Sequence, residues 1–463
     1  MYQLYVKKEK HRYILEELVR EFLRPDEYEV VMQTGVSGDS SGEEESCGER
    51  KQKGPRQEAE KEERDAEKRR VFDELTALTG YRPEWGTLTG VRPAKLAGEM
   101  MDAGYSEEET AAAFRERYYV NDEKTDLVLE TCRNQRFLTS QPAGRTAGVY
   151  IGIPFCPTRC LYCSFASNPA DPEGMRRYLE ALLTEIDAVS EKMKEFQILP
   201  ESVYFGGGTP TSLSAGMLEK LLSRVTERFD MSGVKEFCVE AGRPDTVTEE
   251  KLLAMKRFGV DRISINPQTM NDETLRTIGR AHNAAQVKEA FAMARQAGFD
   301  NINMDLIAGL PGEDLHAMKH TLEEIRALAP ESLTVHSLAI KRAANLNQQM
   351  DDYKSTIHHD MDAMHTAAQE TAQTLGMEPY YLYRQKNIGG NLENVGYAKP
   401  GCECLYNILI MEEMTDIIAA GAGASTKLVY HAENRVERVE NCKSVDDYIN
   451  RFDEMLDRKR KAF

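Results

Sequence analysis

The chain has 463 residues, with 59 Lys and Arg against 77 Asp and Glu, a formal net charge of −18 and a pI near 5.2. Such acidity argues against binding to nucleic acid or to an anionic membrane surface. No apolar run approaches the ~20 residues of a membrane span, and the charges at 7–10 are unlike a signal peptide. Nine cysteines without an export signal indicate a reducing compartment. We therefore expect a cytoplasmic enzyme of two or three domains.

Residues 1–145 are predicted to form an N-terminal α+β domain. Residues 1–34 alternate an extended run, a helical stretch and a second extended run, which predicts a small β-α-β unit. Residues 35–57 hold Gly, Ser, Glu, Lys and Arg with almost no apolar side chain, so we expect a disordered linker there. Residues 58–78 carry mixed charges and are followed by Gly80, which is typical of a solvated helix ended by glycine.

The stretch Trp85–Leu138 is predicted to be mostly helical. Ser106 and Asn121 precede acidic residues, as N-cap residues do, and are the expected helix starts. A turn near the beginning of the stretch presents Arg92 and Lys95. Two interpretations of these cations stay open: they bind an acidic ligand, or they are solvated at a hinge between domains.

From residue 149 onward, short apolar strands alternate with amphipathic helices. This pattern predicts an α/β fold with a parallel sheet and right-handed crossovers, whose functional residues lie at the carboxyl ends of the strands. The expected strands are Val149–Ile153, Ser202–Phe205, Glu236–Glu240, Arg262–Asn266, Asn301–Ile307 and Ser332–Leu338. The expected helices are Gly174–Glu191, Ala215–Phe229, Glu249–Phe258, Ala284–Ala297 and Leu315–Leu328.

Residues 341–463 are predicted to form a C-terminal α+β domain. Its expected elements are a helix over 351–375, an extended segment over 380–386 and a last helix over 445–460. His358 and His365 share one face of the first helix, and for them we favour solvated or core positions over haem ligation. Cys402 and Cys404 form a C-x-C pair without further ligands nearby in the sequence, which favours plain thiols over a metal site.

A loop with three cysteines follows the first strand of the parallel sheet. Cys156, Cys160 and Cys163 have the spacing C-x3-C-x2-C, which fits three corners of a cubane iron–sulfur cluster and leaves the fourth iron open. A structural zinc site would need a fourth ligand, and no second pair lies close by. A disulfide is disfavoured because three is an odd number and nothing marks the chain as secreted.

The sequence CPTRCLYC, followed one strand later by GGGTP, resembles the radical S-adenosylmethionine (SAM) superfamily. More narrowly, YIGIPFCPTRCLYC, GGGTPTSL, IGRAHN and NMDLIAGLPGE resemble the oxygen-independent coproporphyrinogen III oxidases. The stretch WGTLTGVRPAK, Trp85 to Lys95, is similar to the HemZ-type branch of these proteins. The resemblance covers roughly residues 149–339. It implies a partial (β/α)6 barrel over 146–340, between the N-terminal and C-terminal α+β domains.

The resemblance also implies the cofactors and the residues that hold them. The three loop cysteines would bind a [4Fe-4S] cluster whose open iron chelates SAM. Residues on the strands and on the segments that follow them would contact SAM, namely Gly207, Gly208, Thr209, Glu240, Gln268, Arg280, Asp305 and Ala339. Tyr150 and Tyr162 match aromatic positions that touch SAM in the family, and core packing is the alternative for both.

In the resembled oxidases, SAM cleavage yields a 5′-deoxyadenosyl radical that takes hydrogen from a propionate. Two decarboxylations then convert coproporphyrinogen III into protoporphyrinogen IX. A second SAM binds nearby, and an electron donor and an acceptor are required; the sequence identifies neither. Gly152 stands where relatives usually carry histidine, which questions whether the second SAM and the substrate side are kept.

Arg384 and Lys386 are the candidate cations for an anionic porphyrinogen substrate. They share one face of the extended segment 380–386, and an ordinary aromatic–basic strand is the equal alternative. Two other functions use the same scaffold: a haem-binding chaperone, whose members carry an H-N-x-x-Y-W-like stretch, and another radical SAM enzyme. The only tryptophan here is Trp85, far from any such stretch, which favours the oxidase.

Overall fold

The computed structural model describes residues 1–32, 55–89, 92–138, 145–163, 168–169, 171–338, 361–384, 392–433 and 435–462. Most of the expected linker lies outside the described residues, and so do Ala339, His358 and Lys386. No helix in the described part of the chain is long and apolar enough to cross a membrane.

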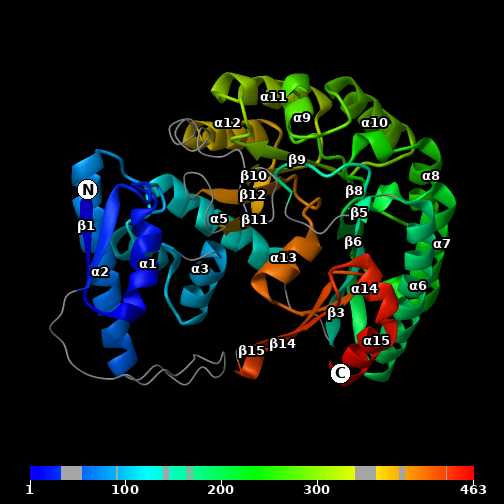
Figure 1. Cartoon of the computed structure of the whole chain (residues 1–463), viewed down its shortest axis with the longest axis horizontal. Helices are drawn as coiled ribbons and strands as arrows, with labels where there is room; N and C mark the ends of the chain where they lie inside the picture. Colours follow the sequence, from blue (N-terminus) through cyan, green and yellow to red (C-terminus); the bar gives the residue numbers. More distant parts are fainter. Residues whose placement is uncertain are drawn as a thin grey trace.

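Six parallel strands form the centre of the fold, and each lies next to the strand that precedes it in the chain (Figure 1). They are β3 (Thr146–Ile153), β6 (Leu199–Gly207), β7 (Glu236–Glu240), β8 (Arg262–Ser264), β9 (Ile302–Ala308) and β10 (Ser332–Ser337). All six are at the positions that the sequence pattern predicts. Their sequential order is what right-handed crossovers produce, and it confirms the predicted α/β class.

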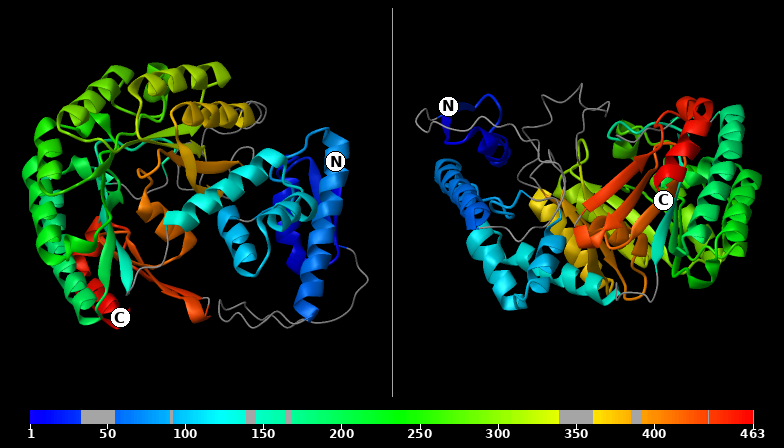
Figure 2. Two further views of the ribbon diagram at one scale, coloured as in Figure 1. Left: turned by 180° about the vertical axis from the view of Figure 1, so that it is seen from behind. Right: turned by 90° about the horizontal axis from the view of Figure 1, so that it is seen from below.

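Helices cover the outer face of these strands and form an arc around them in Figures 1 and 2. They are α6 (Pro172–Glu195), α7 (Ala215–Arg228), α8 (Glu249–Arg257), α9 (Asp272–Thr277), α10 (Ala284–Gln296) and α11 (Leu315–Leu328). Five of the six begin at a polar side chain that accepts a hydrogen bond from the first turn: Asp171, Ser214, Thr248, Asn283 and Asp314. Their apolar faces pack against the sheet and form the main hydrophobic core.

The strands of the C-terminal region continue the same sheet rather than forming one of their own. The antiparallel pair β11 (Glu378–Arg384) and β12 (Glu393–Ala398) extends the edge at β10. At the other edge β13 (Asp416–Ala420) pairs in parallel with β3, and β14 (Ser425–Tyr430) and β15 (Arg435–Glu440) follow. The result is one eleven-stranded sheet. Its C-terminal helices are α12 (Met361–Thr374), α13 (Leu405–Glu412), α14 (Val445–Asn450) and α15 (Phe452–Ala462).

The N-terminal segment forms the predicted β-α-β unit with a hydrophobic core of its own. Strands β1 (Tyr2–Val6) and β2 (Tyr28–Met32) are parallel, and α1 (Glu9–Val19) connects them. The long helix α2 (Pro55–Thr79) covers the unit and contributes Val71, Phe72 and Leu75 to its core. The helix predicted as solvated is therefore buried along one face.

A second group of N-terminal helices packs directly against the eleven-stranded sheet. It consists of α3 (Pro93–Asp102), α4 (Glu107–Ala112), a π-helix (Ala113–Arg117) and α5 (Asp122–Leu138). Ser106 caps α4 in a capping box with Glu109, as the sequence predicts. Helices α3 and α5 both contact β11.

Glu393 on β12 ties this N-terminal group to the sheet. Its carboxylate accepts hydrogen bonds from Trp85 Nε1 at 2.7 Å and from Lys124 Nζ at 2.6 Å. His365 Nδ1 lies 3.8 Å away from this carboxylate. His365 is buried in the core, which is one of the two positions predicted for it. Burial alone raises the pKa of Glu393, but Lys124, His365 and Trp85 outweigh it and lower the pKa to about 2. The carboxylate is therefore ionised and paired inside the core.

Lys124→Met is expected to lower the free energy of unfolding by about 3 kcal/mol, because it leaves the buried Glu393 carboxylate without its cation. Urea denaturation at neutral pH measures the change. The exposed pair Lys288–Glu324 provides a control, since Lys288→Met should change stability by less than about 1 kcal/mol. Equal destabilisation by the two substitutions would contradict the role given to Glu393.

Candidate functional site

The carboxyl ends of the parallel strands open into one cavity of about 1130 Å³. The cysteine loop and the strand ends form one part of its wall, and β11, α13, β14 and β15 of the C-terminal region form another. Every described residue that the sequence singled out for the cluster, for SAM or for the substrate lines this cavity: Tyr150, Cys156, Cys160, Tyr162, Cys163, Gly207, Gly208, Thr209, Glu240, Gln268, Arg280, Asp305 and Arg384.

The three cysteines lie on one loop with polar and cationic groups beside their sulfur atoms. Cys156 Sγ is 3.4 Å from Thr209 Oγ1, and Arg243 Nη1 lies 3.9 Å from Cys160 Sγ. No three His, Cys, Asp or Glu side chains of the described residues converge on a point that would suit a single metal ion. A cubane cluster, by contrast, takes one thiolate per iron and needs no such convergence.

The glycines after β6 bring this strand against the backbone of the cysteine loop. Gly208 N donates to Ile153 O at 2.8 Å, and Thr209 N donates to Phe155 O at 2.7 Å. A Cβ at Gly208 would lie 2.6 Å from Phe155 O, and Gly207 has φ +111°. Both positions therefore need glycine for backbone packing. The resemblance assigned these glycines to SAM, and the structure adds that they hold the cluster loop in place.

Five buried polar atoms of the cavity wall have no hydrogen-bond partner among the described residues. They are Ser264 Oγ, Asn266 Oδ1, Gln268 Oε1, Arg280 Nε and Ser425 Oγ. Leaving such atoms unpaired is costly, and Gln268 also has φ +69°, a backbone conformation rare outside glycine. A polar ligand in the cavity would satisfy them, and the ribose and carboxylate of SAM have the required groups. The residues present thus fit SAM.

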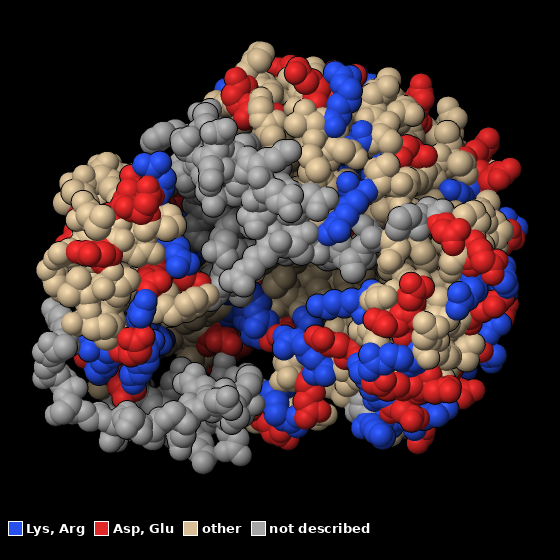
Figure 3. Space-filling model, viewed as in Figure 1, with Lys and Arg blue, Asp and Glu red and all other residues tan. Residues whose placement is uncertain are grey.

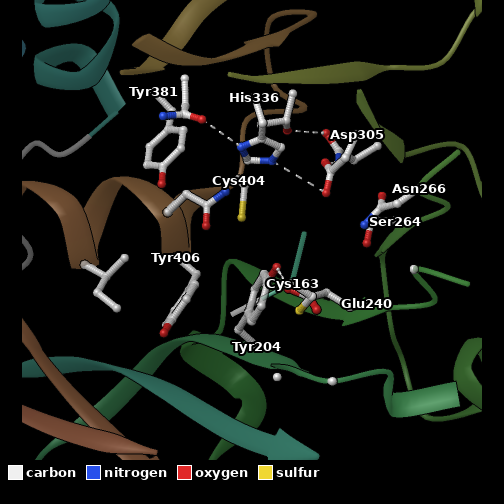
Figure 4. A pocket seen from close by; sticks show the side chains of 18 of the residues that line it. Cys163, Tyr204, Glu240, Ser264, Asn266, Asp305, His336, Tyr381, Cys404 and Tyr406 are labelled. Carbon is white, nitrogen blue, oxygen red and sulfur yellow. Dashed lines mark hydrogen bonds and ion pairs between the residues drawn. The ribbon is translucent and has the colours of Figure 1, made fainter. Parts of the chain in front are cut away.

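Two carboxylates, Glu240 at the end of β7 and Asp305 within β9, differ in their environment (Figure 4). Glu240 accepts a hydrogen bond from Tyr204 OH at 2.5 Å, and burial raises its pKa to about 7. Asp305 lies 3.9 Å from His336 Nε2 and accepts from Asn303 Nδ2 at 2.7 Å. Burial raises the pKa of Asp305, but His336 and Asn303 outweigh it and lower the pKa overall. Asp305 is therefore ionised beside an imidazole that the sequence did not single out.

Comparison of the sequence with known proteins identifies the family. Residues 150–325 match the Radical SAM superfamily. The chain is 42% identical over 394 residues to the oxygen-independent coproporphyrinogen-III oxidase-like protein HemZ of Bacillus subtilis, covering 84% of this chain and 78% of that protein. The chain belongs to the HemZ-type branch of the radical SAM superfamily.

Two further relatives connect this branch to its neighbours. The haem chaperone HemW of Bacillus subtilis is 38% identical over 276 residues, covering 59% of this chain and 69% of that protein. The coproporphyrinogen III oxidase HemN of Escherichia coli superposes with a TM-score of 0.53 at 20% identity, covering 71% of this chain and 73% of that one. The latter shows a common fold. Membership in the radical SAM superfamily implies a [4Fe-4S] cluster and SAM.

Three stacked tyrosines form a wall of the cavity in this branch member, and only one of them was predicted. Tyr204 and Tyr406 are parallel with ring centres 4.4 Å apart, and Tyr150 stacks on Tyr406 at 5.7 Å. Tyr204 and Gly206 are two residues apart on β6 and share a face of the strand, so strand periodicity could have predicted that Tyr204 lines the cavity. Tyr406 comes from α13, more than 200 residues later in the chain, and had no such signal.

The substrate-side segment β11 differs from its predicted arrangement. Tyr381 and Tyr383 line the cavity together with Arg384, whereas Tyr380 is buried beside Tyr381 and does not line it. The Arg384 guanidinium stacks on Trp85, 4.8 Å from the ring centre, and donates to the carbonyl of Leu88. Arg384 was predicted, together with Lys386, as a candidate cation for the substrate; it lines the cavity and is also held by Trp85 and Leu88 of the N-terminal region.

The C-x-C pair remains consistent with plain thiols among the described residues. Cys404 Sγ donates to Glu236 Oε1 at 3.5 Å and lies beside the thiol of Cys238. Cys402 is partly buried, and its carbonyl accepts a hydrogen bond from Arg262 at 2.8 Å.

Proposed function

We propose that this protein is a radical SAM oxidoreductase that decarboxylates coproporphyrinogen III to protoporphyrinogen IX without oxygen, in haem biosynthesis. The observation that carries the proposal is the single cavity in which the cysteine loop, the unpaired strand-end groups and several cations meet. Its volume of about 1130 Å³ exceeds the range of about 300–1,000 Å³ of most small-molecule pockets. It leaves room for a large substrate beside SAM, or for the second SAM of the resembled oxidases.

In this proposal the chain binds and orients both cofactors. Cys156, Cys160 and Cys163 hold the cluster, and Arg280 grips the SAM carboxylate from a position fixed by its hydrogen bond to Tyr162 OH at 3.0 Å. Glu240 faces the charged end of SAM. The cluster and SAM together supply hydrogen-atom abstraction from an unactivated carbon.

The cavity wall has two tasks toward the substrate. The stack of Tyr150, Tyr204 and Tyr406 is a rigid apolar surface against which a pyrrole ring can lie. Burial lowers the pKa of His336 but Asp305 raises it overall, which favours the protonated imidazole, a partner that suits a propionate carboxylate in the cavity. The wall thereby excludes water and places the propionate toward SAM.

A second candidate is a haem chaperone, favoured by the 38% identity to HemW. One observation argues against it. The only tryptophan of the sequence is Trp85, which donates to Glu393 and lies far in the sequence from any H-N-x-x-Y-W-like stretch. The sequence therefore has no complete stretch of that kind.

Anaerobic turnover of coproporphyrinogen III tests the proposal. Protein with reconstituted cluster, reductant, SAM and a cell extract as electron acceptor should form a product with two vinyl groups, and omission of SAM should abolish it. Formation of 5′-deoxyadenosine without any change in the porphyrinogen would refute the substrate. Tight stoichiometric haem binding in that case would favour the chaperone.

A further inference from the structure

Four cations from separate parts of the chain gather at the C-terminal end of α13, around Glu413. Its carboxylate lies 2.9 Å from Arg92 Nη1, 2.7 Å from Lys95 Nζ and 3.9 Å from Arg438 Nη2. Lys427 Nζ donates to a main-chain carbonyl in the last turn of α13 at 3.3 Å. We call Arg92, Lys95, Lys427 and Arg438 the basic cluster. The two interpretations of Arg92 and Lys95 drawn from the sequence were an acidic ligand and solvated cations at a hinge. Neither predicts that they pair with Glu413, a carboxylate of the chain itself.

The basic cluster has more positive charge than its own acids neutralise. Burial raises the pKa of Glu413, but hydrogen bonds from Lys95 and Arg92 outweigh it, so this carboxylate is ionised. Burial raises the pKa of Glu412 to about 7, so this neighbouring group is only partly ionised near neutrality. Burial, followed by repulsion from Arg438, lowers the pKa of Lys427. Four cations thus face one full and one partial negative charge, and an added anion would relieve their repulsion.

The strained backbone conformation of Glu413 indicates that contacts with these cations hold the residue in place. The residue ends α13 in the left-handed conformation, with φ 55° and ψ 44°. Glycine usually takes this position, because a Cβ is strained there. Glutamate persists at a strained position when its contacts over-determine it, and the contacts here are those with the basic cluster.

The basic cluster opens into the cavity that holds the cysteine loop. Arg92, Lys427 and Arg438 line this cavity, from the wall built by the start of α3, by β14 and by β15. Arg92 and Arg438 also line a neighbouring cleft of about 1380 Å³, so the cluster lies where the two spaces meet. Figure 3 shows Lys and Arg side chains at the edge of the hollow in the middle of this face. The Arg438 side chain is 52% exposed and accessible to a ligand.

We infer that the basic cluster binds carboxylate groups of the substrate that do not react. This inference rests on the proposed function, in which a tetracarboxylate places one propionate at SAM and keeps others at a distance. Arginine and lysine on a partly buried wall pair well with such carboxylates. The cysteine loop and the basic cluster then hold the reacting and the non-reacting sides of the same molecule.

The test measures the binding of coproporphyrin III, the oxidised and unreactive form of the porphyrinogen, to the cluster-reconstituted full chain by fluorescence titration. Arg438→Gln and Lys427→Met should each weaken binding about tenfold, the scale of one hydrogen bond to a charged group. Arg257→Gln, which removes an exposed cation of α8 paired with Glu219, is the matched control and should leave the affinity unchanged. Iron content and thermal midpoint check that each variant is folded.

The outcomes separate this inference from the proposed function. Unchanged coproporphyrin affinity in both Arg438→Gln and Lys427→Met overturns the carboxylate site. Weakened binding in both variants, with no decarboxylation by the wild type, supports the carboxylate site and refutes only the proposed reaction. Decarboxylation by the wild type with an unchanged KM in both variants overturns the carboxylate site and leaves the proposed reaction intact.

Discussion

Cys160→Ser is expected to abolish cluster assembly and, with it, SAM cleavage. Cys160 is buried beside Arg243 in the middle of the cysteine loop, and the described residues between Cys156 and Cys163 offer no second thiol in its place. Loss of outer-shell partners of a metal site already lowers affinity about 10- to 100-fold, and loss of a ligand should exceed about 100-fold. Iron and sulfide content after anaerobic reconstitution measures the first effect, and 5′-deoxyadenosine formation measures the second.

Cys404→Ser is the matched control, because Cys404 is a buried cysteine that lines the same cavity but lies outside the loop. Its contact with Glu236 is one that a serine hydroxyl can also make. This variant should keep the iron content of the wild type. Loss of iron in Cys404→Ser would extend the ligand set to the C-x-C pair, and full iron content in Cys160→Ser would refute the loop as the cluster site.

Local periodicity was enough to predict the six parallel strands and five of the six helices that cover them, whereas the short helix α9 was not predicted. Each strand of the barrel, such as Glu236–Glu240, is a short apolar run between turn residues, and each helix has an apolar face that repeats every three to four residues. The pairing of β13 with β3 was beyond such reasoning. These strands lie about 270 residues apart, for example Asp416 beside Ala147, and nothing local in either sequence specifies its partner.

The difference between local patterns and contacts between distant segments also explains which site residues could be predicted. Glu240, Gln268 and Asp305 were singled out by the family resemblance, supported by their places at, after and within predicted strands. His336 lies on β10, and its role depends on Asp305 of the neighbouring strand β9. The partner of Arg92 was invisible for another reason: Glu413 comes from a helix end more than 300 residues later.

In the proposed function Glu240 faces the charged end of SAM, and its environment should then make SAM binding depend on pH. Burial raises its pKa to about 7, while Tyr204 and His336 act in the opposite direction and Asp305 adds to the rise. Near neutrality the carboxyl group of the free protein is therefore about half protonated. The sulfonium of SAM favours the ionised form, so binding below pH 7 has to release the proton.

SAM affinity is accordingly expected to rise about tenfold per pH unit between about pH 5 and 7 and then to level off, because each pKa unit corresponds to about 1.4 kcal/mol. Equilibrium dialysis with the cluster-reconstituted protein measures it. Glu240→Gln keeps the volume and can still accept from Tyr204 OH, but it has no proton to release. The amino group of SAM titrates equally with both proteins, so the difference between their profiles belongs to Glu240. If the affinities of the two proteins change with pH in parallel, Glu240 does not face the charged end of SAM. If the difference between their affinities changes with pH below pH 7 and is constant above it, the geometry described here is supported.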